Sequence, residues 1–314
     1  MALKYSESEP LHLALEQGDL NRVRELLDSG MNADVKDIHH RTPLMIAARK
    51  GAIDIARLLI ERGADVNAKD RRSSVWDGRC TPLHFACETG QIEMAGFLID
   101  NGADPDCITQ CWLNPLSTAI TEKRQQLVEL LLEKGASANG PEKCACPPLN
   151  AAAMIKDAAL VKKLLQLGAD PNRIGGWGDA ALHSTHSFEC ARELVAGGAN
   201  ANLKDRSGTT ALHCLLGVIN PEYISLLIEA GANVNEIATD SGYTPLHILA
   251  SLPSAENAKV LIEAGADVNV LSKQKQTPLD MCLYLLNKEL NDNRERQRLA
   301  DLLRQHGGKT AKEL

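Results

Sequence analysis

Residues 41–67 read RTPLMIAARKGAIDIARLLIERGADVN, and this stretch determines the fold. The Thr-Pro pair at 42–43 predicts a helix start, because a threonine hydroxyl caps free backbone N–H groups and proline is tolerated at the first helical position. Gly51 ends this short helix, and the apolar residues within 53–60 predict a second helix with one apolar face. Gly63 suits the left-handed residue that closes a helix. The segment therefore predicts a helix, a tight turn, a second helix and a loop.

The same pattern recurs along the whole chain of 314 residues. The leucine of each turn and the glycine that ends each unit recur in step, mostly at intervals of 33 residues. Helices this short are unstable alone in water, so each pair must pack on its neighbours. We predict a single repeat domain over residues 1–314, with a short tail at 309–314 and units at approximately 9–37, 41–70, 80–107, 113–140, 147–173, 179–205, 209–236, 243–270 and 276–308.

The composition agrees with a stack of small helices. Hydrophobic residues make up 44% of the chain and aromatic residues only 3%, as expected where alanine stripes let helices pack closely. The net charge is 34 − 41 = −7, which argues against a broad phosphate-binding surface and so against a nucleic-acid partner. No apolar run approaches the roughly 20 residues that span a bilayer. The first ten residues lack the apolar stretch of a signal peptide, so we expect a cytoplasmic protein with free thiols and no membrane segment.

Two recurring motifs resemble those of ankyrin repeat proteins. The turn reads TPLH at 81–84 and 244–247, and the unit ending reads GADVN at 63–67 and 265–269. The resemblance covers about residues 9–308. It implies an all-α solenoid of stacked helix-turn-helix pairs, with β-hairpin-like loops, or fingers, that project at right angles to the helices. It also implies a non-catalytic, monomeric scaffold that binds a partner protein through the finger tips and the concave helix face, without a cofactor.

Several units depart from this pattern. Six additional residues enlarge the finger at 70–80, whereas the sixth unit is three residues short around His186 and Ser187. The last unit is also longer, at 287–296, where we expect extended helices and a polar end cap. The glycine between the two helices is replaced in four units, by Lys123, Lys156, Ile219 and Pro253.

All three tryptophans lie in predicted fingers rather than on helices. Tryptophan and tyrosine are enriched among the residues that dominate binding energies at interfaces. Arginines beside Trp76 supply cationic donors for carboxylates on a partner. The alternatives are that each tryptophan packs on the next finger and that each arginine is a solvated surface charge. We predict a partner-binding set that consists of Arg71, Arg72, Trp76, Arg79, Trp112, Trp177 and Tyr243.

Cysteines in neighbouring fingers suggest an alternative function. Thiolates of Cys107, Cys111, Cys144 and Cys146 would have to converge to hold zinc or to pair under oxidation, which would make the protein a thiol- or zinc-dependent regulator. Their spacings match no known zinc motif, so we expect no metal. Metal content and thiol reactivity distinguish this alternative from a binding scaffold.

We predict no enzymatic activity, because the sequence contains no G-x-S-x-G, no phosphate-binding G-x-x-x-x-G-K-[ST] and no H-E-x-x-H. Histidines recur at one position of the repeat, which predicts that they structure the turns and do not act as catalytic bases. These are His12, His84, His183, His213 and His247.

The alanine-rich repeats and residues 307–314 also resemble bacterial members of the family. This leaves a second alternative, a bacterial ankyrin protein that is delivered into another cell and acts on host proteins. The identity of the partner distinguishes it from a scaffold that works in its own cell, because finger residues vary freely on an unchanged stack.

Overall fold

The computed structural model describes residues 9–70, 79–109, 113–214, 220–286 and 293–314. Within these ranges the chain forms eighteen helices and no strand, which confirms the all-α prediction, and each predicted unit contains two helices. None of the described helices is long and apolar enough to cross a bilayer. The helices are α1 (Glu9–Gln17), α2 (Leu20–Asp28), α3 (Pro43–Lys50), α4 (Ile53–Glu61), α5 (Pro82–Thr89), α6 (Ile92–Asp100), α7 (Pro115–Thr121), α8 (Gln125–Glu133), α9 (Pro148–Met154), α10 (Ala158–Gln166), α11 (Ala181–Ser184), α12 (Phe188–Ala196), α13 (Ala211–Cys214), α14 (Pro221–Glu229), α15 (Pro245–Ser251), α16 (Ala255–Glu263), α17 (Pro278–Leu286) and α18 (Asn293–Gln305).

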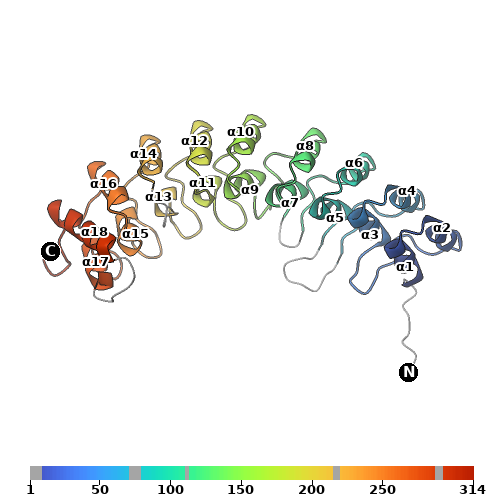
Figure 1. Cartoon of the computed structure of the whole chain (residues 1–314), viewed down its shortest axis with the longest axis horizontal. Helices are drawn as coiled ribbons and strands as arrows, with labels where there is room; N and C mark the ends of the chain where they lie inside the picture. Colours follow the sequence, from blue (N-terminus) through green and yellow to red (C-terminus); the bar gives the residue numbers. More distant parts are fainter. Residues whose placement is uncertain (1–8, 71–78, 110–112, 215–219, 287–292) are drawn as a thin grey trace, which may run out of the picture. The chain divides into compact units, whose positions relative to one another are not determined.

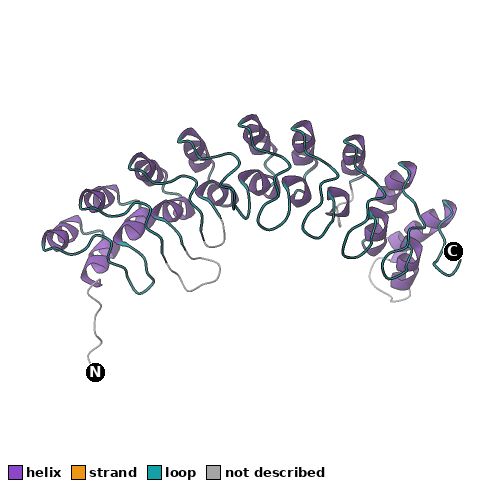
Figure 2. Ribbon diagram, turned by 180° about the vertical axis from the view of Figure 1, so that it is seen from behind, coloured by secondary structure: helices purple, strands orange, loops and turns teal. Residues whose placement is uncertain are grey.

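The chain forms two compact units, Met1–Ala151 and Ala152–Leu314, and each is described by itself. In the first unit, α1, α3, α5 and α7 pack in one row and α2, α4, α6 and α8 form a second row (Figure 1). In the second unit, α11, α13, α15 and α17 form the first row, and α10, α12, α14, α16 and α18 form the second. Within each unit the fingers project beyond the first helices (Figure 2). That the two units form a single repeat domain stays a prediction.

The core repeats with the sequence. First helices bury a leucine completely, as at Leu44 and Leu83, and place alanines such as Ala48 and Ala86 against the next helix. Second helices bury leucines in the same way, as at Leu59. Full burial of each leucine contributes about 2 kcal/mol. The predicted alanine stripes are therefore real packing surfaces, and they explain why so few aromatic rings are needed.

In the first five repeats of the chain, the tight turn between the two helices has one left-handed residue. Its φ is 73°, 69° and 76° at Gly18, Gly51 and Gly90, and it remains left-handed where lysine replaces glycine, at 55° for Lys123 and 63° for Lys156. A residue with a Cβ atom is destabilised by about 1–2 kcal/mol in this left-handed backbone conformation. These two lysines therefore keep the turn of the repeat at a cost in backbone strain.

Replacing Lys156 with glycine is expected to raise the free energy of unfolding by about 0.5 kcal/mol, because relief of strain exceeds the added flexibility of the unfolded chain. The matched control is Lys163→Gly within α10. That change is expected to lower the free energy of unfolding by about 0.7 kcal/mol, since glycine is a poor helix former. Urea unfolding measures both, and a loss of stability in Lys156→Gly would contradict the strain.

The shortened sixth unit is supported from the next one. Its first helix, α11, has only four residues and ends at Ser184. Tyr223 of α14 is fully buried, and its hydroxyl donates to the carbonyl of Thr185, 38 residues earlier in the chain, at 3.1 Å. This burial raises the pKa of Tyr223. A single side chain therefore secures the loop that follows the shortened helix.

Candidate functional site

A backbone hydrogen bond closes the base of each of the four fingers in the second unit. The N–H of Asp205 donates to the carbonyl of Thr209 at 2.9 Å, and the N–H of Ser272 donates to that of Gln276 at 2.9 Å. The Asp205 carboxylate also accepts from the N–H and the hydroxyl of Thr209, at 2.8 and 2.6 Å. The fingers therefore have the hydrogen bonding of a hairpin end, although no described residue forms a strand.

The turn histidines join each finger to the next. Nδ1 of His84 accepts from the N–H of Thr81 at 3.2 Å, and Nε2 donates to the carbonyl of Leu113 in the following finger at 3.3 Å. Burial lowers the pKa of His84 to about 4. The other four histidines donate in the same way, to the carbonyls of Arg41, Leu203, Tyr243 and Gln276. Their predicted role in structuring turns is confirmed.

Asparagines make a second link that the sequence analysis missed. Nδ2 of Asn202 donates to the carbonyl of Gly231 at 2.7 Å, and its Oδ1 accepts from the N–H of Asn233 at 2.7 Å. The recurrence of asparagine at the end of each GADVN motif was the available signal. The same pair of bonds is made by Asn67, Asn172, Asn235 and Asn269.

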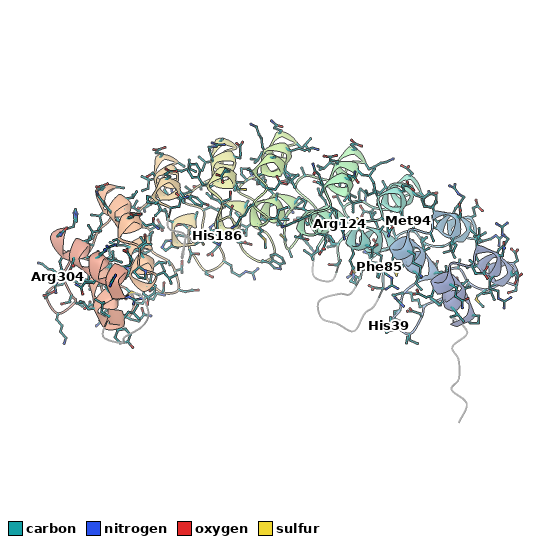
Figure 3. All side chains as sticks on the ribbon, viewed as in Figure 1. His39, Phe85, Met94, Arg124, His186 and Arg304 are labelled. Atoms are coloured by element: carbon teal, nitrogen blue, oxygen red, sulfur yellow. The ribbon has the colours of Figure 1, made fainter. Side chains whose placement is uncertain are left out.

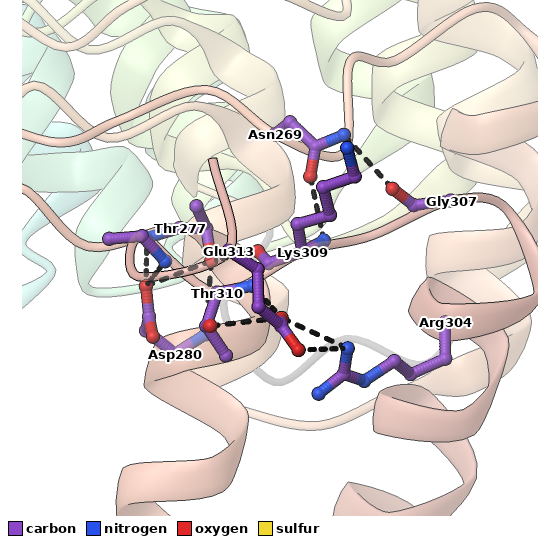
Figure 4. A network of polar contacts seen from close by, with 9 residues as sticks. Asn269, Thr277, Asp280, Arg304, Gly307, Lys309, Thr310 and Glu313 are labelled. Carbon is purple, nitrogen blue, oxygen red and sulfur yellow. Dashed lines mark hydrogen bonds and ion pairs between the residues drawn. The ribbon is translucent and has the colours of Figure 1, made fainter.

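Towards the C-terminus, Asn269 and the turn at residues 277–280 form the equivalent hydrogen bonds with residues 307–311 (Figure 4). Asn269 donates to the carbonyl of Gly307 at 3.0 Å, and Asp280, in the place of histidine, accepts from the N–H of Ala311 at 2.8 Å. Hydrogen bonds from Thr310 and Arg304 then hold the pKa of Glu313 at about 2. The C-terminal residues thus dock where the described fingers dock on the earlier units.

The fingers of the second unit also contact one another directly. The N–H of Arg206 donates to the carbonyl of Gly178 at 2.8 Å, and its guanidinium donates to that of Gly176 at 2.9 Å. A Cβ on Gly178, whose φ is 98°, would come within 2.5 Å of the Cβ of Arg206. The N–H of Lys273 similarly donates to the carbonyl of Ser241 at 3.2 Å. The fingers are therefore a packed, preformed surface.

The structure describes only part of the predicted partner-binding set. Trp177 is 52% exposed on the finger held by Arg206. Tyr243 is half-buried, and its ring stacks on that of His247 with centroids 5.4 Å apart. Arg79 is exposed and belongs to the first unit, whereas the other two belong to the second. Four predicted residues lie outside the described residues, namely Arg71, Arg72, Trp76 and Trp112.

An exposed finger tip of the first unit was not in the predicted set. Ile38 is 81% exposed, and its neighbour His39 lies at the end of the same finger (Figure 3). The sequence marks this position only as a loop residue between two repeats. Exposure of an apolar residue here adds a candidate contact to the finger surface.

The described cysteines are not arranged as reactive thiols. None of the eight forms a disulfide, and burial raises the pKa of Cys107 to about 12. Cys144 and Cys146 are also buried, whereas Cys111 lies outside the described residues. Among described residues, no group of three histidine, cysteine or acidic side chains is placed to hold a metal. Nothing in this part of the chain favours thiolate chemistry, which needs a lowered pKa and access.

Comparisons with known proteins agree with this geometry. A sequence model of ankyrin repeats (3 copies) matches residues 3–70, 73–142, 149–238 and 177–272. Serine/threonine-protein kinase 12 of Arabidopsis thaliana is 45% identical over 64 residues, which are 20% of this chain and 14% of that protein. "Ankyrin repeat, SAM and basic leucine zipper domain-containing protein 1" of Neofelis nebulosa is 33% identical over 79 residues, 25% of this chain and 17% of that protein. The chain thus spans less than a fifth of either relative.

The crystal structure of the human ASB11 ankyrin repeat domain is similar to this chain, with a TM-score of 0.55 and 26% identity. The similarity covers 70% of this chain and 97% of that one. Ankyrin repeats are generally protein–protein interaction modules, and the fold is typically a non-catalytic scaffold. The repeated turns, the links between units and the matched segments lead to one conclusion: the chain belongs to the ankyrin repeat family.

Proposed function

We propose that this chain is a non-catalytic scaffold that binds a partner protein through its finger tips and the exposed face of its first helices. We place it in the cytoplasm as a monomer. The proposal includes Arg71, Arg72, Trp76 and Trp112 as contacts, together with Trp177.

The exposure of Trp177 carries the proposal. A tryptophan buries a large apolar area when a partner covers it, and such residues dominate binding energies. Here the ring is 52% exposed on a finger whose backbone is held by Arg206 at two points. The ring of Trp177 does not close the finger, because the N–H of Gly175 already donates to the carbonyl of Asp179 at 2.9 Å.

The preformed fingers favour binding for a second reason. Association costs free energy for each loop and side chain that it orders. Hydrogen bonds to Arg206 and to the turn histidines order the fingers before a partner arrives. Most of the free energy needed to order the fingers is therefore spent during folding. Binding then loses less free energy to ordering, and the partner's contacts contribute more to the affinity.

Replacing Trp177 with alanine is expected to weaken capture of the partner by about tenfold or more, which corresponds to about 1.4 kcal/mol. The same loss is expected for Trp76→Ala and Trp112→Ala. The measurement is affinity capture from a lysate of the producing cells, with bound proteins quantified by mass spectrometry, followed by titration of the purified partner.

The matched control is Leu167→Ala, which removes an apolar side chain that is 54% exposed at the end of α10. It is expected to capture the same proteins as the unchanged chain. Circular dichroism verifies that every variant keeps its helices. Equal recovery on all three tryptophan variants and on the control would refute the finger surface.

A further inference from the structure

Three fingers of the second unit present an apolar residue at the same register position. Each precedes the residue whose N–H closes its finger: Ile174 before Gly175, Ile237 before Ala238, and Leu271 before Ser272. Their side chains are 46%, 48% and 48% exposed. The remaining finger has Lys204 at this position, and we call these four residues the finger stripe.

Hydrogen bonds fix the register of the stripe. Two residues before each stripe residue lies an asparagine that bonds to the next unit, as Asn202 does before Lys204 and Asn235 before Ile237. The four fingers follow one another along the unit in both views (Figures 1 and 2). Because packed helices lie about 8–10 Å apart, successive stripe residues are spaced by about that distance.

Cations dominate the exposed tips of the same fingers. Arg206, Lys273 and Lys275 are exposed there, whereas Asp240 is the one exposed carboxylate among the described tips. Neither of these lysines forms an ion pair with a described residue. This local excess is opposite in sign to the net charge of −7 of the chain, so it favours an acidic partner.

The acidic side chains nearest the stripe are already engaged. Asp205 accepts the N–H and hydroxyl of Thr209 within its own finger. Glu236 pairs with Lys204 at 2.7 Å, and this contact lowers the pKa of Glu236. Thr209 holds the Asp205 carboxylate within its own finger, and Lys204 offsets the charge of Glu236, so Arg206, Lys273 and Lys275 are the positive charges that the tips present to a partner.

The spacing also selects the conformation of a partner chain. A polyproline II helix repeats every three residues and rises about 3.1 Å per residue, so its third residues lie about 9 Å apart on one face. That distance matches one unit of the stripe. In a β-strand, residues three apart point to opposite faces.

We propose that the fingers of the second unit bind an acidic segment of the partner in the polyproline II conformation, with apolar side chains at every third position. The apolar side chains pack on Ile174, Ile237 and Leu271 and along the aliphatic stem of Lys204. The carboxylates between them face Arg206, Lys273 and Lys275. This inference rests on the proposed function and specifies the chemistry of the partner at the same fingers.

The probe is a fluorescein-labelled synthetic peptide of four Leu-Pro-Glu repeats, titrated with the full chain by fluorescence anisotropy. Saturable binding is expected. Leu271→Asp and Ile237→Asp are each expected to weaken it by about tenfold, because each removes an apolar contact and repels the glutamates. The control Leu167→Asp alters an equally exposed leucine of the same unit outside the fingers, and it is expected to leave the affinity unchanged.

Two further peptides test the two halves of the proposal. Four Leu-Pro-Lys repeats reverse the charge, and four Leu-Pro-Pro-Glu repeats change the period from three to four; both are expected to bind at least about tenfold more weakly. The inference is overturned if the first peptide does not bind, if either altered peptide binds equally well, or if Leu167→Asp weakens binding as much as Leu271→Asp. Tryptophan-dependent capture of a partner together with a failed peptide titration would overturn this inference alone.

Discussion

Tyr223→Ala is expected to lower the free energy of unfolding by about 3–5 kcal/mol, the cost of removing a buried aromatic ring and leaving a cavity. The ring is fully buried, and its hydroxyl donates to the carbonyl of Thr185 beside the four-residue helix α11. Urea unfolding followed by circular dichroism measures the loss. Amide hydrogen exchange in α11 and α12 is expected to accelerate most, since the supported loop joins these helices.

Two variants separate the contributions of Tyr223. Tyr223→Phe keeps the ring and leaves the buried Thr185 carbonyl without its donor, which is expected to cost about 1–2 kcal/mol. Tyr284→Ala changes a tyrosine that is 52% exposed, so its effect is expected to stay within about 0.5 kcal/mol. A loss for Tyr223→Ala as small as that expected for Tyr284→Ala would show that Tyr223 does not support the sixth unit.

Acid is expected to destabilise the protein through its turn histidines. Burial lowers the pKa of His84 to about 4, against its ordinary value of 6.5 in an unfolded chain. The unfolded state therefore binds the proton first, and the stabilisation is complete above pH 6.5 and lost as the pH falls towards 4. The full loss from His84 is about 3 kcal/mol. Burial also lowers the pKa of His213 and His247, so their contributions have the same sign.

The measurement is the free energy of unfolding in urea at several pH values from 7 to 4. Protonation is costly because Nδ1 of His84 faces the N–H of Thr81 and Nε2 already donates to Leu113. His84→Asn removes the titrating group and is expected to flatten the pH dependence by about 3 kcal/mol, although it lowers the stability at pH 7. The same pH dependence in this variant and in the unchanged chain would rule out His84 as its source.

The repeat made most of the fold predictable. The recurring equivalents of Leu44 and Gly63 predicted two helices in every unit, as the structure has them. The replacement of glycine by Lys123 and Lys156 was visible in the sequence, but their left-handed backbone was not predicted. The support from Tyr223 was not predictable, because it depends on a contact with Thr185 of the preceding unit. Periodicity predicts only the features that all units share. The contact between Tyr223 and Thr185 instead compensates for the missing residues of the sixth unit.

The candidate site was less predictable than the fold. Finger positions followed from the repeat, but exposure depends on how neighbouring loops pack. Trp177 and Tyr243 have the same kind of place in the sequence, yet one ring is exposed and the other stacks on His247. The finger stripe could likewise be recognised only from the hydrogen bonds that show at which residue each finger closes.

Docking of the C-terminal residues has a consequence for self-association. A solenoid with an open end offers the donors and acceptors that the next unit would use, and head-to-tail addition of copies through such an edge builds open filaments. Here Lys309 accepts from the Thr277 hydroxyl, and the N–H of Ala311 donates to Asp280, so both residues occupy groups of the ninth unit that a following finger would contact. Addition of a second copy at this face would first have to displace Lys309 and Ala311 from Thr277 and Asp280.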